Sequence, residues 1–331
     1  MPPGSDFRAL ERRNRRETVE LILVFILLFL ALGAAFDFFA GTLQIQNGHL
    51  VGAPVFTVLA LIFALIQSTI SYFGGAPLIL LSVHANKLMP DSPKHQMVLD
   101  VIQEMALASR LPVPTAYVIP DSPPNAFATG RNPAHSVICV TQGLVDEMDR
   151  EEMQGVIGHE MSHIADYDIR TMMMVAVLVG GIAMLSDFMV RLSFFGGGSR
   201  SRDSDNRDGG IIAILIIVLA VVAPVLSQVI AMAVSREREY LADASSVEFT
   251  RNPRALLRAL QHIAQTESPL KEGTRGTAHL FIVSPLAATA DDEGGFFANL
   301  LSTHPPLRKR IERLQAMLGA PAPVVPASDR A

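Results

Sequence analysis

Gly158-His159-Glu160-Met161-Ser162-His163 is the stretch that decides both the fold and the chemistry of this 331-residue chain. In an α-helix, residues four apart lie one turn above each other, so His159 and His163 can face one metal ion. Glu160 then reaches a water molecule held at that ion, as in zinc sites that hydrolyse bonds. The alternative is a solvated polar helix face with two incidental histidines.

A hydrolytic zinc site needs a third protein ligand and an open fourth position, where the pKa of a bound water falls towards neutrality. The charged segment Ser235 to Asp243 is the best source of that ligand. Glu239 and Asp243 are one helical turn apart, so one can bind metal while the other accepts a hydrogen bond from a ligating imidazole. Spacing alone does not choose between Glu237 and Glu239, and a charged face beside a membrane is the alternative.

The composition indicates a membrane protein, because half of the residues are apolar, 18% are charged and the mean hydropathy is +0.33. A helix needs about 20 apolar residues to cross a bilayer. Of four uncharged stretches, the second and the fourth are long enough outright. The first becomes long enough if Asp37 lies near the membrane interface, and the third if Asp187 and Arg191 form an ion pair. These stretches are Leu21 to Phe36, Val51 to Val83, Thr171 to Ser186 and Ile211 to Val234.

Arginines near the first stretch set the expected topology. Residues 1–20 hold five arginines, whereas the predicted loop at about residues 40–54 holds neither Lys nor Arg, so the N-terminus is expected in the cytoplasm. A cleaved signal sequence is the alternative, but bulky Phe36, Phe38 and Phe39 stand where a cleavage site needs small residues. The expected segments are a basic N-terminus (1–18), transmembrane helices 1 and 2 (19–83), the first catalytic part (84–170), a transmembrane hairpin (171–234), the second catalytic part (235–316) and a disordered tail (317–331).

Between the second and third stretches, the pattern predicts a small sheet beside helices. His95 to Arg110 has helical periodicity, and strands are predicted at Thr115 to Ile119, near Ala126 to Thr129, and at Ser136 to Val140. Asp149 with Glu152 forms a capping-box pattern, which predicts a helix that continues to the third apolar stretch. Ser235 to Gln265 is also helical in pattern, with an interruption near Asn252 and Pro253. The fold class is therefore an α-helical polytopic membrane protein with four transmembrane helices and a mainly helical α+β, zincin-like protease domain.

Charge and cysteine content exclude other classes. The net charge is only −5 and the basic residues form no long stripe, so no nucleic-acid partner is expected. Cys139 is the single cysteine, which excludes an intramolecular disulfide, and its apolar neighbours indicate a small buried side chain rather than a catalytic thiol.

The His-Glu-x-x-His motif and three later strings together make the chain resemble a known family. His-Glu-Met-Ser-His, then Ser235-Arg-Glu-Arg-Glu-Tyr-Leu-Ala-Asp-Ala244, and finally Ser302-Thr-His-Pro-Pro306 with Arg310-Ile-Glu-Arg-Leu314 resemble the HtpX family of bacterial heat-shock membrane proteases. That family is related to the CAAX prenyl proteases. The similarity runs from about residue 95 to 315.

The resemblance assigns roles that spacing leaves open. It implies that Glu239 is the third zinc ligand and that Asp243 orients a ligating imidazole. It also implies an edge strand beside the active site, to which a substrate adds as a further strand. That strand comprises Asn125, Ala126, Phe127, Ala128 and Thr129.

Two residues keep alternative roles. His304 matches the histidine that helps to stabilise the oxyanion in the family, and the alternative is a capping or packing histidine. Arg236 either orients Glu239 or meets lipid headgroups.

The expected function is a zinc endopeptidase with one Zn²⁺ per chain, held by His159, His163 and Glu239, with Glu160 as general base. Its expected location is the bacterial inner membrane, with the catalytic domain in the cytoplasm, where it cleaves misfolded membrane proteins or unfolded polypeptides in a stress response. An intramembrane protease and a non-catalytic, zinc-braced scaffold are the alternatives. The sequence gives no oligomeric state.

Overall fold

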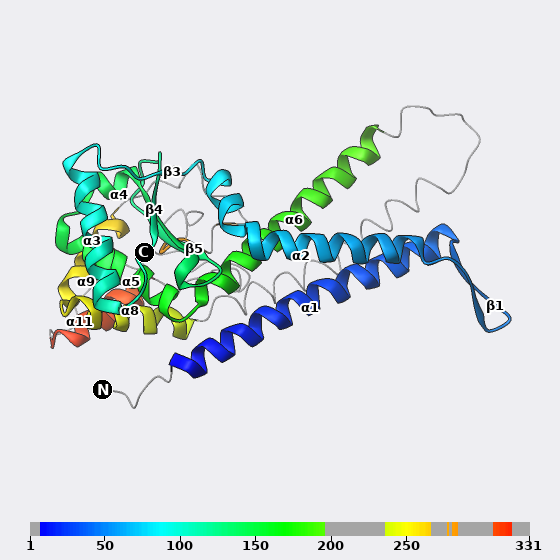
Figure 1. Ribbon diagram of the computed structural model, residues 1–331, viewed down its shortest axis with the longest axis horizontal. Helices are drawn as coiled ribbons and strands as arrows, with labels where there is room; N and C mark the ends of the chain where they lie inside the picture. Colours follow the sequence, from blue (N-terminus) through cyan, green and yellow to red (C-terminus); the bar gives the residue numbers. More distant parts are fainter. Residues whose placement is uncertain (1–6, 196–235, 266–276, 278–279, 284–306, 320–331) are drawn as a thin grey trace, which may run out of the picture. The chain divides into compact units, whose positions relative to one another are not determined.

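The computed structural model describes residues 7–195, 236–265, 277, 280–283 and 307–319. The chain divides into two compact units (Figure 1). The helical unit comprises Met1–Ile79 and Arg170–Ala233, and the α/β unit comprises Leu80–Ile169 and Val234–Ala331.

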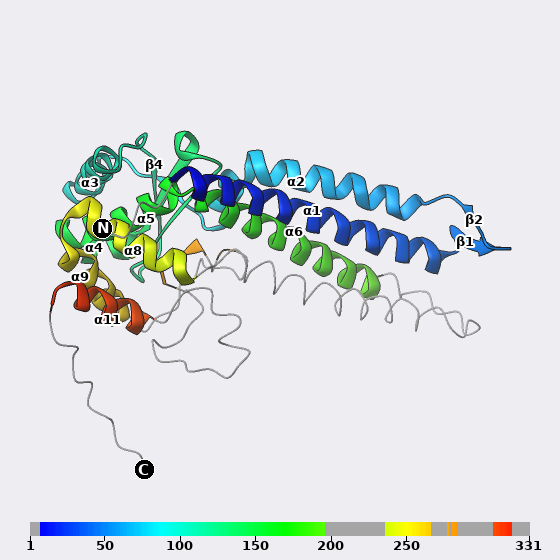
Figure 2. The same ribbon diagram turned by 90° about the horizontal axis from the view of Figure 1, so that it is seen from below.

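Three long helices build the described part of the helical unit: α1 (Phe7–Ala40), α2 (Val55–Ser82) and α6 (Asp168–Phe195). Helices α1 and α2 lie side by side in both views (Figure 2), and the rings of Phe29 and Phe63 are 5.0 Å apart. Hydrogen bonds join α6 to both neighbours, since the Thr18 and Thr171 hydroxyls are 3.2 Å apart and Gln67 Nε2 donates to the Val177 carbonyl at 3.2 Å. Such interhelical hydrogen bonds are common between membrane helices.

Within the described residues, two helices are long and apolar enough to cross a membrane, Arg12–Ala40 and Val55–Ser82. The first contains the uncharged stretch Leu21 to Phe36, and the second covers Val55–Ser82 of the predicted stretch Val51 to Val83, whose first two residues lie in a β-strand instead. The third stretch lies in the continuous helix α6, and its Asp187 and Arg191 side chains lie outside the described set. The fourth stretch, 211–234, also lies outside it, as does the predicted disordered tail (317–331) from residue 320 onward. The first residue of that tail, Met317, is the last residue of a helix instead. Four transmembrane helices therefore stay a prediction.

A two-stranded hairpin joins α1 to α2, in a segment for which the sequence predicted only a loop. Strands β1 (Leu43–Gln46) and β2 (His49–Gly52) pair around Asn47 and Gly48, which both have positive φ. Asn-Gly is a strong signal for a two-residue hairpin turn.

Asp37, near the end of α1, caps the beginning of α2. Its carboxylate accepts hydrogen bonds from the backbone N–H groups of Phe56 at 2.9 Å and Thr57 at 2.8 Å, and from the hydroxyls of Thr57 and Thr42. The first N–H groups of a helix have no partner within the helix, so a carboxylate at this point satisfies them and complements the helix dipole. Asp37 thereby fixes how the chain turns between the two helices.

We expect Asp37→Ala to lower the free energy of unfolding by about 1–2 kcal/mol, because the α2 cap is lost. Thermal unfolding in detergent measures the effect. Asp37→Asn keeps one acceptor oxygen and serves as the control, with a smaller loss. An Asp37→Ala variant that unfolds at the wild-type temperature would contradict the capping role.

The α/β unit contains a four-stranded sheet in the order β3-β4-β6-β5. Its strands are β3 (Asn86–Lys87), β4 (Thr115–Ile119), β5 (Ala126–Gly130) and β6 (Ser136–Thr141). The β4–β6 pair is parallel and the other two pairs are antiparallel. The three predicted strands are confirmed within one residue, and Cys139 is fully buried in β6 as expected.

Helices pack around this sheet and form the core of the unit. They are α3 (Pro93–Ser109), α4 (Gln142–Glu147), α5 (Arg150–Ala165), α8 (Arg236–Thr250), α9 (Pro253–Ala264) and α11 (Leu307–Met317). The predicted interruption at Asn252 is confirmed, since Asn252 caps α9 and Pro253 is its first residue. The core joins apolar side chains of these helices to apolar residues of the strands, with Ile138, Ile157, Leu260 and Leu314 among its fully buried members. Helix α8 contributes the partly buried Val247 and Phe249 at its border.

The prediction of one helix from the capping box into the third apolar stretch is wrong. Helix α5 ends at Ala165, and α6 begins at Asp168. Between them Tyr167 adopts a left-handed conformation with φ of 62°, which breaks the helical path. Such a conformation costs a non-glycine residue about 1–2 kcal/mol. The break turns the carboxylate of Asp168 towards His163 of the His-Glu-x-x-His motif.

Candidate metal centre

Helix α5 carries the His-Glu-x-x-His motif in its buried interior. Its start is the predicted capping box: Asp149 accepts a hydrogen bond from the Glu152 backbone N–H at 2.9 Å, and the Glu152 side chain accepts one from the Asp149 N–H at 3.1 Å. His159 and His163 lie on one face of α5 and are 1% and 7% exposed. The two imidazoles therefore have fixed surroundings rather than free rotation in water.

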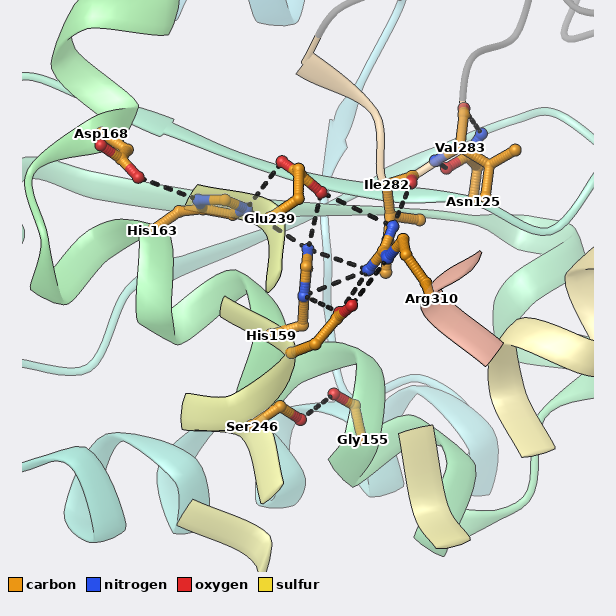
Figure 3. Close-up of polar contacts among 11 residues, drawn as sticks. Asn125, Gly155, His159, His163, Asp168, Glu239, Ser246, Ile282, Val283 and Arg310 are labelled. Carbon is orange, nitrogen blue, oxygen red and sulfur yellow. Dashed lines mark hydrogen bonds and ion pairs between the residues drawn. The ribbon is translucent and has the colours of Figure 1, made fainter. Parts of the chain in front are cut away.

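Helix α8 lies close against α5 because small residues line their contact. Ser246 Oγ donates a hydrogen bond to the Gly155 carbonyl at 2.7 Å (Figure 3), and a Cβ added at Gly158 would lie 3.0 Å from that same Oγ. This close approach brings Glu239, in the first turn of α8, against the two imidazoles. Glu237 is exposed, whereas Glu239 is buried beside the histidines. The structure therefore favours Glu239 over Glu237 as the third ligand, a choice that the sequence spacing left open.

The three side chains converge in a geometry that fits a metal ion. His159 Nε2 and His163 Nε2 are 3.3 Å apart, and each lies 3.6 Å from an oxygen of the Glu239 carboxylate. All three ligand atoms lie within 4.8 Å of one another and are buried. Ligands of a tetrahedral ion at 2.0–2.1 Å are separated by about 3.4 Å. The donor set of two nitrogens and one oxygen, with one position left over, therefore suits a catalytic metal ion.

Each imidazole also faces a carboxylate through its second nitrogen. His159 Nδ1 lies 3.0 Å from Asp243, and His163 Nδ1 lies 3.4 Å from Asp168. A carboxylate in this position fixes the tautomer and the ring orientation of a ligating histidine. The sequence predicted this contact for Asp243, but it did not predict it for Asp168.

Arginines hold both carboxylates. Arg310 of α11 donates from Nη2 to Asp243 Oδ1 at 2.6 Å and from Nε to Oδ2 at 3.0 Å, which is a two-pronged contact. Arg238 donates from Nη1 to Asp168 Oδ1 at 3.2 Å. A guanidinium that binds a carboxylate through two N–H groups fixes the orientation of that carboxylate. Each metal-facing histidine is thus the first member of a His–Asp–Arg chain.

Arg310 is a further participant that sequence reasoning missed, as it missed Asp168 and Arg238. It is 1% exposed, lies 3.6 Å from Glu239 Oε2, and its Nη1 donates to the Ile282 carbonyl at 2.9 Å (Figure 3). Fully buried arginines are rare without paired charges. The sequence did contain a signal for its burial. Helix α11 is amphipathic, and Arg310 falls on its apolar side together with Leu307 and Leu314.

Burial shifts the pKa of Glu160, which follows His159 in the motif. Desolvation, together with the nearby Glu239 carboxylate, raises the pKa of Glu160 to about 7. The charges of His163 and Arg310 oppose the rise, as does a backbone hydrogen bond from Ala128. A carboxyl group with a pKa near neutrality can accept a proton and release it again, which general acid–base catalysis requires.

The two imidazoles differ in their proton affinity. Burial, followed by the charge of Arg310, lowers the pKa of His159 to about 4 despite its contact with Asp243. Burial also opposes protonation of His163, but its hydrogen bond to Asp168 and the charge of Glu239 outweigh that effect and raise its pKa to about 9. The excess of carboxylates that favours a proton on His163 equally favours a divalent cation beside it.

Strand β5, the predicted substrate strand, is an edge of the four-stranded sheet. All five of its residues are buried, and the Ile282 N–H donates to the Ala126 carbonyl at 2.9 Å. The Asn125 side chain accepts from the Val283 N–H at 3.3 Å and donates to the Val283 carbonyl at 2.8 Å. The chain's own residues 282–283 therefore take up the first part of the outer edge of β5. Substrate binding to this strand stays a prediction.

Two predicted participants lie outside the described residues. They are His304, in the segment 284–306, and the side chain of Arg236. Their expected roles in oxyanion binding and in orienting Glu239 stay predictions.

We expect Asp168→Asn to weaken metal binding by about 10- to 100-fold, because residues that orient metal-bound histidines have effects of that size. Competition with a chromogenic chelator measures the affinity. Asp100→Asn, on the exposed side of α3, is the matched control. Equal affinity in the two variants would show that Asp168 does not orient His163.

Known proteins resemble the chain in sequence over most of its length. The family model described as "Peptidase family M48" matches residues 92–318. A protease HtpX homolog of Lactobacillus helveticus is 38% identical over 311 residues, which cover 92% of this chain and 98% of that protein. A protease HtpX homolog of Thermoanaerobacter pseudethanolicus is 38% identical over 310 residues, covering 93% and 97%. One of Streptococcus uberis is 36% identical over 307 residues, covering 92% and 98%.

A solved structure, Ste24p of S. mikatae, aligns with 92% of this chain at a TM-score of 0.46 and 18% identity. This chain spans 66% of that protein's length.

Proposed function

The chain belongs to peptidase family M48, and from that premise we propose that it is a zinc-dependent endopeptidase that cleaves misfolded or damaged membrane proteins at the cytoplasmic face of the bacterial inner membrane. The family makes it a membrane metalloendopeptidase. The proposal adds the identity of the ion, the roles of single residues, the substrates and the orientation of the chain in the membrane.

The convergence of His159, His163 and Glu239 is the observation that carries this function. The three ligand atoms come from two helices, α5 and α8, that are separated in sequence by the predicted transmembrane hairpin, and they lie within 4.8 Å of one another. Two imidazoles and one carboxylate with an open fourth position form the usual ligand set of catalytic zinc. The described part of the chain holds one such set, which supports one Zn²⁺ per chain.

Glu160 is the proposed general base. When bound, zinc would polarise the peptide carbonyl and lower the pKa of the hydrolytic water. Glu160 accepts a proton from the attacking water and passes it to the leaving amine, as a buried carboxyl group can do. Asp243 and Asp168 hold the imidazoles in orientation, and Arg310 and Arg238 hold those carboxylates.

Substrate binding is proposed at the strand Asn125 to Thr129, where an extended peptide would add along the outer edge beyond the Ala126 contact with Ile282. The hydrogen bond between Ala128 and Glu160 supports this, because it places the strand beside the general base. His304 is proposed as a donor to the developing oxyanion, and Arg236 as a residue that orients Glu239.

The sequence supports a cytoplasmic orientation. Five arginines precede α1's apolar stretch, and residues 38–82 contain no Asp, Glu, Lys or Arg, so the N-terminus is proposed to lie in the cytoplasm. An even number of crossings then returns both halves of the α/β unit to that side. The charged residues around the motif, such as Asp149 and Glu151 before it and Asp168 after it, favour a site outside the lipid over an intramembrane protease.

We expect the detergent-purified protein to cleave itself or casein only when zinc is present. Removal of the metal with a chelator should abolish cleavage, and added Zn²⁺ should restore it, because the metal supplies the Lewis acid. Metal analysis of the same sample tests the alternative, a zinc-braced scaffold. Bound zinc without any cleavage of casein or of an unfolded membrane protein would favour the scaffold and refute the proposed activity.

A further inference from the structure

The β1–β2 hairpin between α1 and α2 has one apolar face. Leu43 pairs with Gly52, and Ile45 pairs with Leu50. In an antiparallel pair, residues opposite each other point to the same side, and successive residues alternate. One face of the hairpin therefore carries Leu43, Ile45 and Leu50, while the other carries Gln44, Gln46, His49 and Val51.

The described residues leave most of this apolar face uncovered, since Ile45 and Leu50 are each 68% exposed and Leu43 is partly buried. A lone two-stranded hairpin is marginally stable in water, and large exposed apolar patches usually mark an interaction surface. The hairpin is in this respect unlike β3–β6, whose apolar residues are covered by helices.

The hairpin adjoins the apolar ends of α1 and α2. Leu21 to Ala40 of α1 would span about 30 Å, the thickness of the hydrocarbon layer, so β1 begins just beyond its boundary. The single charged residue of that stretch, Asp37, is buried and capped against α2. Exposed apolar side chains flank the hairpin on both helices, namely Phe38, Phe39, Val55 and Phe56.

Backbone hydrogen bonding limits how deep the β1–β2 hairpin can lie in the bilayer. Both outer edges of a two-stranded hairpin leave N–H and C=O groups without a sheet partner, and such groups are not tolerated in the hydrocarbon layer. Water and phospholipid headgroups can satisfy them. Side-chain polarity agrees with this depth, because Gln44, Gln46 and His49 need water on the opposite face.

We propose that the β1–β2 hairpin is a membrane-surface element that lies in the headgroup layer, with Leu43, Ile45 and Leu50 turned to the acyl chains of phospholipids and Gln44, Gln46 and His49 turned to water. The partner is the phospholipid bilayer itself. The proposal rests on α1 and α2 crossing the membrane and is independent of the peptidase chemistry.

The chain has no tryptophan, so a single introduced tryptophan reports its own surroundings. Ile45→Trp and Gln46→Trp are a matched pair, adjacent in sequence and on opposite faces. The full-length variants are placed in phosphatidylcholine–phosphatidylglycerol nanodiscs, which leave both membrane surfaces open to solvent. We expect the Ile45→Trp emission to shift to shorter wavelength and to be quenched by lipids brominated near the glycerol. Gln46→Trp should emit as in water and be quenched by iodide.

Leu27→Trp, in the middle of the α1 stretch, is the reference and should be quenched only by lipids brominated deep in the chain. If Leu27→Trp shows no lipid quenching, the membrane placement fails and the proposal with it. If the two hairpin positions behave alike, the hairpin either stands in water or is fully inserted, and the proposal is overturned. A tryptophan at 45 shielded from both quenchers would assign the face to a protein partner instead. Leu50→Trp reports the same face if Ile45→Trp does not fold.

Discussion

Replacing Glu160 by glutamine is expected to lower kcat for peptide cleavage by about 100-fold or more while zinc stays bound. The amide keeps the size of the side chain but cannot accept the proton of the attacking water. His159, His163 and Glu239 are unchanged, so the ligand set remains complete. The measurement is single-turnover cleavage of an unfolded membrane protein, together with metal analysis of the same preparation.

Glu151→Gln is the matched control for this variant. It makes the same chemical change on the same helix, at a side chain that is 61% exposed, and should leave cleavage within experimental error of wild type. A Glu160→Gln protein that cleaves at the rate of Glu151→Gln would remove Glu160 from the mechanism. Loss of zinc from Glu160→Gln would instead mean that Glu160 supports the ligand geometry.

Local signals explain how much of the fold was predictable. The strands around Ala116, Phe127 and Ile138 and the helix cap at Asp149 depend on neighbouring residues, and each was placed within one residue. Tyr167 was not predictable in this way, because a left-handed tyrosine has no sequence signature and its conformation depends on how α6 continues beyond it. The β1–β2 hairpin was predictable from Asn47 and Gly48, and the long apolar surroundings obscured that signal.

The site was predictable where its residues are close in sequence. His159 and His163 are one turn apart, so their proximity follows from the helix alone. That Glu239 and Asp243 lie close to the histidines could be predicted only from the family resemblance. The neighbouring sequence does not distinguish Glu239 from Glu237, which the structure shows to be exposed. The contacts of Asp168 and Arg310 depend on how α6 and α11 pack, and no spacing rule encodes such contacts between distant segments.

Arg310→Met is expected to lower the free energy of unfolding by about 3–5 kcal/mol, the cost of removing one partner of a buried ion pair. Methionine keeps the apolar stem of the side chain but leaves Asp243 buried without its guanidinium. Metal affinity should fall by about 10- to 100-fold as well, because Asp243 no longer holds His159 in orientation. Thermal unfolding and chelator competition measure the two effects separately.

Arg308→Met is the control, since Arg308 lies on the same helix with a side chain 59% exposed and pairs only with Glu312 among the contacts seen there. A surface pair of this kind contributes about 0–1 kcal/mol, so this variant should stay close to wild type. Arg310→Lys retains the charge but cannot contact the Asp243 carboxylate and the Ile282 carbonyl together. Its stability and metal affinity should therefore lie between those of Arg310→Met and Arg308→Met. The double variant Asp243→Asn with Arg310→Met removes both charges, so it should regain stability over Arg310→Met while metal affinity stays low. If metal affinity returned with stability, Arg310 would act on the fold alone and not on the orientation of His159.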